Sequence, residues 1–278
     1  MYCPRFRNLI RPAQHADMPL PHLDVDHERR FGGIERLYGA GTRRALHLGS
    51  VAVVGVGGVG SWVVEGLARS GVGNITLIDF DHVALSNMNR QIQALESTLG
   101  MAKVQALEAR IRDINPACRV TCIDEFLTEA NLAQLLPPGG FDAVIDACDE
   151  AKVKAALIAH ARFNKIKLVV CGAAGGKRDP LRLRRDDLAR VTHDALLARI
   201  RNLLKKSLNI QPRKNGKFGV TCVYLEEPSQ RGAACSTADL SCSGYGSAVT
   251  VTAAMGLAAA ALCLEHMVQQ PPKMDAAT

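Results

Sequence analysis

Four glycines follow a short apolar segment, Val51–Val54, and precede a segment with a helical pattern, Ser61–Ser70. They are Gly55, Gly57, Gly58 and Gly60. Residues without a Cβ let the backbone turn tightly and approach a phosphate closely. The free N–H groups at the start of the following helix then face the anion, and the helix dipole favours negative charge there. This pattern predicts a strand–turn–helix unit that binds a nucleotide; the alternative is a tight turn without a ligand.

An acidic residue ends the next apolar segment. Asn74–Asp79 has the composition of a second strand, and Asp79 is its last residue. An acidic side chain about 20 positions after such a glycine turn commonly bonds ribose hydroxyls. Because NAD-binding proteins use the same arrangement, these two features predict a nucleotide site but do not identify the nucleotide.

The first half of the chain alternates predicted strands and helices. Strands separated by helices indicate βαβ units and a parallel sheet that is covered on both faces. We therefore predict an α/β fold, a doubly wound, Rossmann-like, mostly parallel sheet. The strands are expected at 51–54, 74–79, 119–123, 141–146 and 167–171, and the helices at 61–70, 101–114, 129–136 and 151–164.

The second half is less regular and reads as a C-terminal elaboration of the same domain. We expect strands at 181–185 and 218–225, a basic helix at 194–207 and an apolar final helix. No internal repeat or interdomain linker is visible. The predicted organisation is a flexible tail (1–29), a single domain (30–268) and a short tail (269–278). Within that domain, the core spans about 50–176 and the elaboration about 177–268.

The positive charge is concentrated in one stretch. The 278 residues carry a net charge of +7, whereas residues 177–217 alone contain 13 Lys and Arg against 4 Asp. The rest of the chain is therefore slightly acidic. A basic patch of this kind favours an anionic partner such as nucleic acid. The alternative is a solvated helix and loop without a partner.

The nine cysteines contain no C-x-x-C pair, so we expect no structural zinc. No signal peptide is predicted, because Met1–Arg30 lacks a continuous apolar region. Reduced thiols and a nucleotide-type fold indicate a cytoplasmic protein. Leu240–Leu264 has no charged residue and is long enough to span a membrane. Its Ser, Gly, Thr and Ala content favours a buried helix or a dimer-interface helix instead.

Three further motifs follow the glycine turn in order. They are Asn87-Met-Asn-Arg-Gln91, Gly100-Met-Ala-Lys103 and Asp146-Ala-Cys-Asp149. With the glycine turn, this set resembles the adenylating enzymes of the ubiquitin-activating superfamily, which includes ThiF and MoeB. The resemblance covers about residues 51–149 and is more specific than the glycine turn alone.

The resemblance implies that ATP binds here and activates a carboxylate by adenylation. Arg90 and Lys103 would contact the phosphates, and Asp149 would hold Mg²⁺. Asp79 would hold the ribose, and five polar residues would complete the pocket: Asp81, Asn87, Asn89, Gln91 and Asp146. Each has a simpler alternative as a solvated cation, a helix cap or a turn residue.

Within the superfamily, the chain most resembles the tRNA threonylcarbamoyladenosine dehydratases, over about residues 30–267. The similar segments are Arg30–Gly39, Gly60–Trp62, Asn89–Ile92, Cys171–Gly176, Gly216–Cys222 and Ser241–Gly246. This resemblance implies a modified tRNA substrate, a homodimer and a cysteine-desulfurase or sulfur-acceptor partner. Ring closure in that reaction needs no enzyme thiol, so we expect neither Cys235 nor Cys242 to be essential.

Three other functions remain open from the sequence. The chain could adenylate the C-terminus of a ubiquitin-like or sulfur-carrier protein, act as an NAD-dependent oxidoreductase, or bind tRNA without catalysis. The motifs around Arg90 and Lys103 count against hydride transfer, which does not need them. Arg30 and Arg36 are candidates for an arginine that reaches across a dimer, and the sequence leaves their role open.

Overall fold

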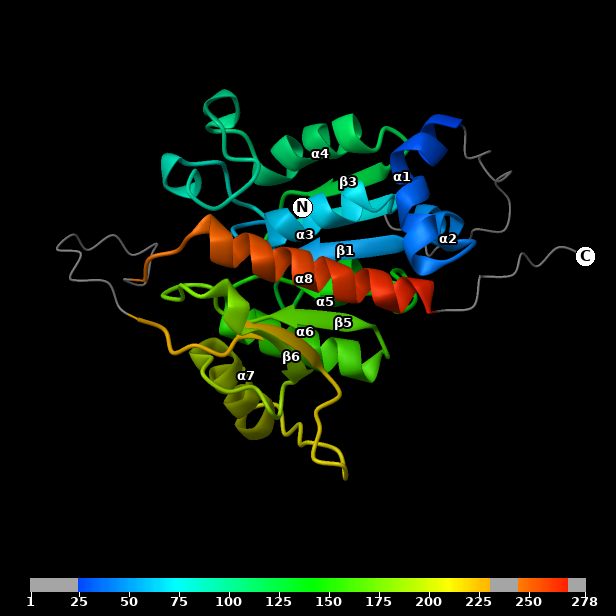
Figure 1. Ribbon diagram of the computed structural model, residues 1–278. Coiled ribbons are helices and arrows are strands. Elements are labelled where there is room, and N and C mark those ends of the chain that lie inside the picture. The colour runs from blue at the N-terminus through cyan, green and yellow to red at the C-terminus, as the bar shows by residue number, and fades with distance from the viewer. Residues whose placement is uncertain (1–24, 231–244, 270–278) are drawn as a thin grey trace, which may run out of the picture.

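The computed structural model describes residues 25–230 and 245–269, which form a seven-stranded sheet with helices on both faces (Figure 1). The strand order is β3-β2-β1-β4-β5-β7-β6, and β6 alone runs antiparallel to its neighbour. The predicted doubly wound, mostly parallel α/β fold is thus confirmed. The strands are β1 (Ser50–Val54), β2 (Asn74–Ile78), β3 (Arg119–Ile123), β4 (Ala143–Asp146), β5 (Leu168–Cys171), β6 (Leu183–Asp187) and β7 (Thr221–Leu225).

Helices α3, α4 and α8 cover one face of the sheet, and α5, α6 and α7 cover the other. Helices α1 and α2 lie at the end of the sheet opposite the glycine turn (Figure 1). The bounds are α1 (Val25–Tyr38), α2 (Thr42–Leu48), α3 (Gly60–Arg69), α4 (Lys103–Ile114), α5 (Leu132–Leu135), α6 (Ala151–Phe163), α7 (Ala195–Lys206) and α8 (Val249–Val268). Short 3-10 helices are η2 (Leu85–Asn87), η3 (Glu96–Thr98) and η4 (Pro180–Arg182).

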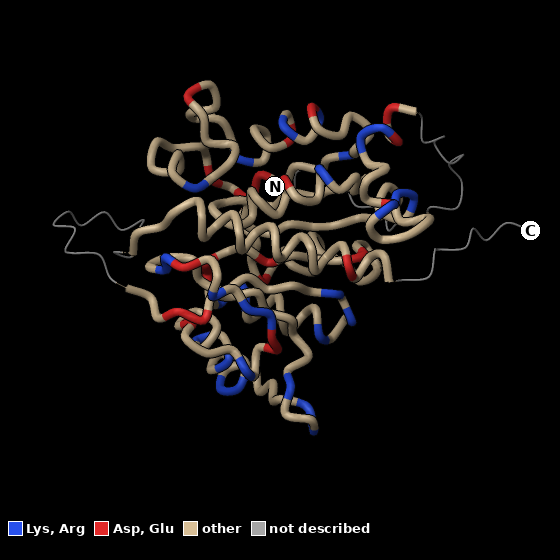
Figure 2. Tube along the Cα trace, viewed as in Figure 1, with Lys and Arg blue, Asp and Glu red and all other residues tan. Residues whose placement is uncertain are grey.

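The final helix α8 packs beside α3 and carries a single charged residue, Glu265 (Figure 2). A Cβ added at Gly66 of α3 would lie 2.9 Å from the Cβ of Ala260 in α8. A Cβ at Gly256 would lie 2.7 Å from that of Trp62. The two small residues thus let the helices approach closely. By length and composition α8 could cross a membrane, and half of it is buried inside the protein, which agrees with either predicted role, a buried helix or a dimer-interface helix.

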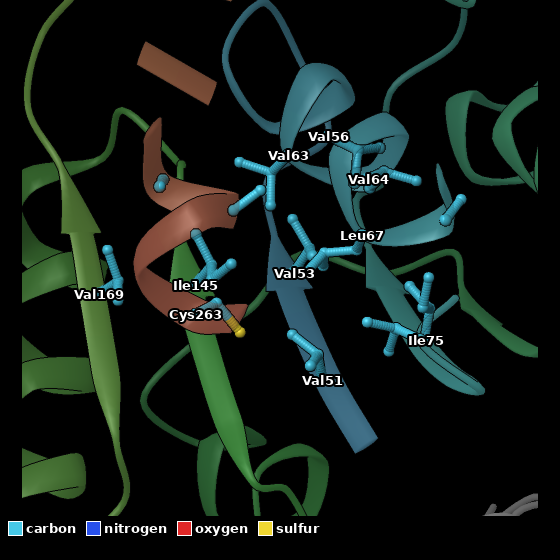
Figure 3. Close-up of a cluster of buried hydrophobic side chains, with 14 of the residues drawn as sticks. Val51, Val53, Val56, Val63, Val64, Leu67, Ile75, Ile145, Val169 and Cys263 are labelled. Carbon is cyan, nitrogen blue, oxygen red and sulfur yellow. The ribbon is translucent and has the colours of Figure 1, made fainter. Parts of the chain in front are cut away.

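The central strands are apolar on both sides. Val51 and Val53 of β1 pack with α3 and α8, as Figure 3 shows, whereas Ala52 and Val54 pack on the side of α5 and α6. All four side chains are buried. This double coverage explains why β1 is an unbroken apolar run instead of an alternating one.

Two elements differ from the sequence prediction. Helix α1 begins at Val25, inside the stretch 1–29 that we expected to be a flexible tail, and Phe31 anchors it by packing on Gly71. The pair Gly32–Gly33 within α1 weakens the helical pattern in the sequence, because glycine has a low helix propensity. The helix expected at 129–136 shortens to α5, which is a single turn.

Candidate nucleotide-binding site

The glycine turn lies at the carboxyl edge of the sheet, where β1 separates β2 from β4. Val54, the last residue of β1, is in register with Ile78 of β2 and Asp146 of β4. The segments that follow these three strands therefore start side by side. Strands β2 and β3 are added on one side of β1, and the later strands, starting with β4, are added on its other side. Ligands of open α/β sheets bind at such a switch point in the strand order.

The turn itself needs glycine at its two ends for different reasons. Gly55 has a φ of +77°, and a Cβ there would lie 2.7 Å from the backbone nitrogen of Cys148. A Cβ on Gly60 would overlap the carbonyl oxygen of Gly55. Gly57 is more open, with the Gln91 amide nitrogen as its nearest neighbour at 3.8 Å. The ends thus close the turn, and its middle leaves a backbone surface that a phosphate can approach.

Asp79 ties the turn to the next loop. Its carboxylate accepts one hydrogen bond from the backbone N–H of Val56 (2.7 Å) and another from that of Asp81 (2.9 Å). A carboxylate has about four acceptor positions, so Asp79 keeps capacity for ribose hydroxyls. It is partly exposed beside the turn, as its predicted role requires.

Arg90 lies directly against the turn. A Cβ on Gly58 would lie 3.3 Å from Cδ of Arg90 and 3.3 Å from Cγ2 of Thr252. The Arg90 guanidinium donates to the carbonyl oxygen of Ser86 and to Oδ1 of Asn89, the latter at 3.0 Å. The Arg90 side chain is therefore held beside the middle of the glycine turn, where a phosphate is predicted to bind.

The other polar residues of this loop hold it in shape. Asn89 donates from Nδ2 to the carbonyl oxygen of Ser247 at 2.7 Å, and Asn87 accepts from the backbone N–H of Ala84 at 3.1 Å. Buried Gln93 donates from Nε2 to Oε1 of Gln91 (3.1 Å). The same Nε2 donates to the carbonyl oxygen of Val56 (3.0 Å). Gln93 was not predicted from the sequence, because the recognisable motif ends at Gln91.

Lys103 begins α4 and reaches the same region. Its Nζ lies 2.7 Å from Oδ2 of Asp81, and its backbone N–H donates to the Asp81 carbonyl oxygen at 2.9 Å. The Lys103 side chain is nearly buried, whereas that of Asp81 is more than half exposed. The pair belongs to the loop that Asp79 joins to the turn, and the phosphate contact predicted for Lys103 stays a prediction.

The two carboxylates after β4 differ. Asp149 is exposed and follows Cys148, which packs on Gly55. Asp146 has no exposed surface, and its Oδ1 lies 2.8 Å from Nζ of the equally buried Lys154. It therefore supports the loop from inside instead of facing a ligand, which differs from its predicted place in the pocket. It does not cap α6 either, because Glu150 does so.

Arg30 lies far from the turn of its own chain. It donates from Nη1 to the carbonyl oxygen of Ile114 at 3.1 Å and lines a cavity of about 460 Å³ with Arg69 and Arg110. This cavity is at the end of α3, whereas Gly60 begins that helix. Arg30 therefore does not reach the glycine turn of its own chain, and a contact across a dimer stays a prediction.

The described cysteines are poor nucleophiles. Burial raises the pKa of Cys118, Cys122, Cys171 and Cys263 to about 12. Burial is also the main cause that raises the pKa of Cys148 well above its ordinary value. Thiols with such a pKa carry almost no thiolate at neutral pH. Cys235 and Cys242 lie outside the described residues.

A glycine turn at the switch point of a doubly wound sheet, flanked by an arginine, a lysine and exposed carboxylates, defines a nucleotide-binding α/β protein. Residues 33–276 match the ThiF family, and the chain belongs to that family. Its sequence is 45% identical over 252 residues to the tRNA threonylcarbamoyladenosine dehydratase of Escherichia coli K12. This match covers 86% of the present chain and 94% of the relative.

Solved structures agree with this assignment. The E. coli dehydratase in complex with ATP has a TM-score of 0.82 and 43% identity, covering 88% of this chain and 96% of that one. The same enzyme in complex with AMP has a TM-score of 0.82 and 42% identity, with coverage of 90% and 97%. The family resemblance inferred from the sequence motifs is therefore confirmed.

Proposed function

We propose that this protein is an ATP-dependent enzyme that dehydrates threonylcarbamoyladenosine next to the anticodon of tRNA, forming a ring. The observation that carries the proposal is Arg90, held against Gly58 at the glycine turn of a ThiF-family fold. The 45% identity to a dehydratase of that name, over most of both chains, supports the choice of substrate.

In the proposed first step, the substrate carboxylate attacks the α-phosphorus of ATP and pyrophosphate leaves. In the second step, a nucleophile within the modified nucleoside attacks the acyl carbon, AMP leaves, and the ring closes. The net change is the loss of one water from the nucleoside, whose oxygen departs with AMP. Because the substrate supplies the nucleophile, the buried thiols of the described residues have no part in this scheme.

The protein's contribution is positioning and electrostatic stabilisation of charge that develops on phosphate oxygens. Arg90 offers a planar fork of donors close to the turn, and Lys103 offers a point charge. The 2.7 Å contact between Lys103 and Asp81 keeps that charge at the site before ATP arrives. Asp79 is assigned to the ribose, and the amide of Gln91 to the middle of the turn.

Mg²⁺ fits the donor set at Asp149. Within 25–230 and 245–269 there is no group of three or more His, Cys, Asp or Glu that could hold a metal without other ligands. A Mg²⁺ that bridges nucleotide phosphates takes only one or two protein carboxylates. Asp149 is an exposed carboxylate that directly follows Cys148, which packs on Gly55, whereas Asp146 is fully buried and its Oδ1 contacts Lys154. When bound, the metal would neutralise charge on the phosphates of ATP.

The proposal includes a homodimer and a cysteine-desulfurase or sulfur-acceptor partner, both from family resemblance, and a cytoplasmic location, from the cysteine content and the nucleotide-type fold. The second candidate function is adenylation of the C-terminal glycine of a ubiquitin-like or sulfur-carrier protein. Membership of the ThiF family favours both candidate functions equally, since each of them activates a carboxylate by adenylation at the same kind of site. The length of the match to the dehydratase favours the first candidate.

Mass spectrometry of tRNA nucleosides tests the proposal. Protein, ATP and Mg²⁺ are incubated with tRNA that carries threonylcarbamoyladenosine, and we expect a product nucleoside lighter by one water. Unmodified tRNA serves as the control and should not stimulate pyrophosphate release. Equal turnover with unmodified tRNA, or with a carrier protein alone, would reject the proposed substrate.

A further inference from the structure

The basic stretch at 177–217 divides into two unlike halves. Residues 177–194 contain six Lys and Arg with four Asp, whereas residues 195–225 contain seven Lys and Arg and no acidic residue. The first half comprises η4 and β6, and the second comprises α7 and the turn before β7. Most of the positive charge therefore belongs to the second half.

Cations of the first half mostly have carboxylate partners. Lys177 is buried with Asp194 at 3.1 Å. Four arginines on the surface also pair, namely Arg182 with Asp179 (3.4 Å), Arg184 with Glu226 (3.3 Å), Arg185 with Glu265 (3.3 Å) and Arg190 with Asp186 (3.9 Å). Local neutralisation leaves this half little attraction for a polyanion.

Phe218, just before β7, brings a cation of the second half together with one from α6. Arg162 of α6 and Lys205 of α7 lie over the buried Phe218 ring, 5.8 and 6.0 Å from its centroid. Burial and then the nearby charge of Arg213 lower the pKa of Arg162, so like charges face one another here. We define the α7 basic cluster as Arg162, Lys205, Lys206, Arg213, Lys214 and Lys217, none of which forms a salt bridge with a described residue.

Asp187 is the carboxylate whose charge acts on Arg162 and raises its pKa, but its oxygens are already occupied by backbone N–H groups. It accepts hydrogen bonds from four backbone N–H groups, those of Ala189 (2.9 Å), Phe218 (2.8 Å), Gly219 (2.7 Å) and Val220 (3.0 Å). Burial raises the pKa of Asp187, but these four hydrogen bonds together lower it by more than burial raises it. The net shift of the Asp187 pKa is therefore downward. Asp187 therefore anchors the turn without pairing with its cations.

The turn that carries three of the cations is ordered. The backbone N–H of Arg213 donates to the carbonyl oxygen of Lys217, and that of Gly216 donates to the Arg213 carbonyl oxygen, both at 2.8 Å. Gly216 has a φ of +76°, which closes the turn. The cluster is thus presented on a fixed backbone, and Figure 2 shows Lys and Arg along α7 and the turn below it.

We propose that the α7 basic cluster docks the phosphodiester backbone of the RNA substrate at a distance from the ATP site. Phe218 lies before the amino end of β7, whereas the glycine turn lies at the carboxyl ends of the strands. β7 is three strands from β1, which is roughly 15 Å at the usual strand spacing. A mononucleotide at the turn cannot reach the cluster, but a folded RNA can touch both places.

RNA is the partner that suits this cluster. When lysines and arginines without ion pairs contact RNA phosphates, counterions are released from the RNA, and this release favours binding. This inference rests on the proposed function, since it takes tRNA as the substrate. It adds that contact outside the anticodon comes from α6, α7 and the 213–217 turn and not from the paired arginines of β6.

Two variants with equal charge change test this inference. The cluster variant is Lys205→Ala, Lys214→Ala and Lys217→Ala together. The matched control is Arg182→Ala, Arg184→Ala and Arg185→Ala together. We expect the cluster variant to raise the Kd for tRNA roughly tenfold and to lower the salt slope of log Kd by roughly two. The control should change both quantities little, and neither variant should change the KM for ATP.

The outcomes separate the two proposals. If wild-type protein yields no dehydrated nucleoside, the proposed function fails. If wild type is active but the cluster variant binds tRNA as tightly as the control, this inference fails and an acidic protein becomes the better occupant. Replacing the three lysines by arginine should keep tRNA affinity, and circular dichroism should show that every variant is folded.

Discussion

The indole Nε1–H of Trp62 donates to the backbone carbonyl oxygen of Arg90 at 3.0 Å. The hydroxyl of Thr252 reaches the same oxygen at 3.3 Å. Trp62 belongs to α3 and Thr252 to α8, so two adjacent helices fix one carbonyl of the loop that passes the glycine turn. The two hydrogen bonds therefore position the backbone of Arg90, while its side chain lies against Gly58.

Trp62→Phe should weaken ATP use without unfolding the protein. The change removes one hydrogen bond to the Arg90 carbonyl and keeps the ring's apolar packing. A neutral hydrogen bond contributes about 0.5–1.5 kcal/mol, so we expect kcat/KM for ATP to fall roughly two- to tenfold. Pyrophosphate release at varied ATP measures this. Thr252→Val, which removes the second donor, should have a similar effect, and Thr252→Ser should have a smaller one.

Trp62 is the single tryptophan of the chain, so it also reports on Arg90 directly. Wild-type fluorescence should change when ATP binds, because the indole bonds to Arg90, which we propose contacts the nucleotide. An Arg90→Ala protein should show a smaller change. Identical kinetics for Trp62→Phe together with constant fluorescence would contradict this positioning role.

Arg90→Ala should abolish most activity. Loss of one donor that stabilises transition-state charge typically costs a factor of about 10²–10³ in rate. Arg90→Lys keeps the charge but loses the planar fork, so we expect an intermediate rate. Initial rates of pyrophosphate release measure both, and thermal unfolding should show wild-type stability. A near-normal rate for the alanine variant would remove Arg90 from the mechanism.

Alanine at two positions of the glycine turn should have contrasting effects. At Gly58 the atoms nearest the new Cβ belong to the side chains of Arg90 and Thr252, at 3.3 Å, and these can shift. At Gly60 it overlaps the backbone oxygen of Gly55, which cannot shift without opening the turn. Gly58→Ala should therefore raise the KM for ATP while the Tm stays close to that of wild type.

Gly60→Ala should instead lower stability by about 1–3 kcal/mol, the usual cost of overpacking. Urea denaturation and ATP titration of the two variants separate the effects. Equal stability loss in both would show that the turn behaves as one rigid unit and that Gly58 has no particular relation to the ligand.

The sequence predicted the parts of the site that depend on local pattern. The strand before Gly55, the helix after Gly60 and the acid at Asp79 follow from residue type and spacing within about 30 positions. The mostly parallel, doubly wound sheet follows from the alternation of strands and helices, whereas the position of β1 between β2 and β4 comes from the structure.

The remainder depends on contacts between distant segments. Thr252 meets the Arg90 carbonyl across 162 positions, and no local pattern in α8 marks that contact. Asp146 and Asp149 have the same side chain in one short motif, yet burial with Lys154 separates them. Helix α1 was missed because its glycine pair obscures a helix that packing of Phe31 stabilises.

The buried pair of Asp146 and Lys154 predicts strong coupling between two variants. Lys154→Met would leave the Asp146 carboxylate buried without a cation, and breaking a buried pair in this way costs about 3–5 kcal/mol. Asp146→Asn should also destabilise, because Lys154 loses its partner. The double variant should be less destabilised than the sum of the single ones, which urea denaturation of all four proteins can measure. Simple additivity would contradict this coupling.

The triad of Glu65, Arg69 and Arg110 predicts a pH dependence of stability. Arg110 contacts both carboxylate oxygens of the buried Glu65, at 2.6 and 2.9 Å, and Arg69 contacts one of them at 2.6 Å. Burial raises the pKa of Glu65, but the two arginines together lower it by more than burial raises it. The net shift is therefore downward from 4.5. A carboxyl whose pKa is lower in the folded than in the unfolded protein stabilises the folded state at pH values above its unfolded pKa. That contribution is lost as the pH falls through the pKa of the folded state.

Glu65→Gln should therefore destabilise the protein by about 1–3 kcal/mol at pH 7, with the difference from wild type shrinking below about pH 4.5. Urea denaturation at pH 7, 5, 4 and 3 measures this. Asp26→Asn is the control, because Asp26 pairs with Arg29 on the open surface, and exposed pairs contribute little. A difference between Glu65→Gln and wild type that stays constant down to pH 3 would mean that the triad's contribution does not depend on the charge of Glu65.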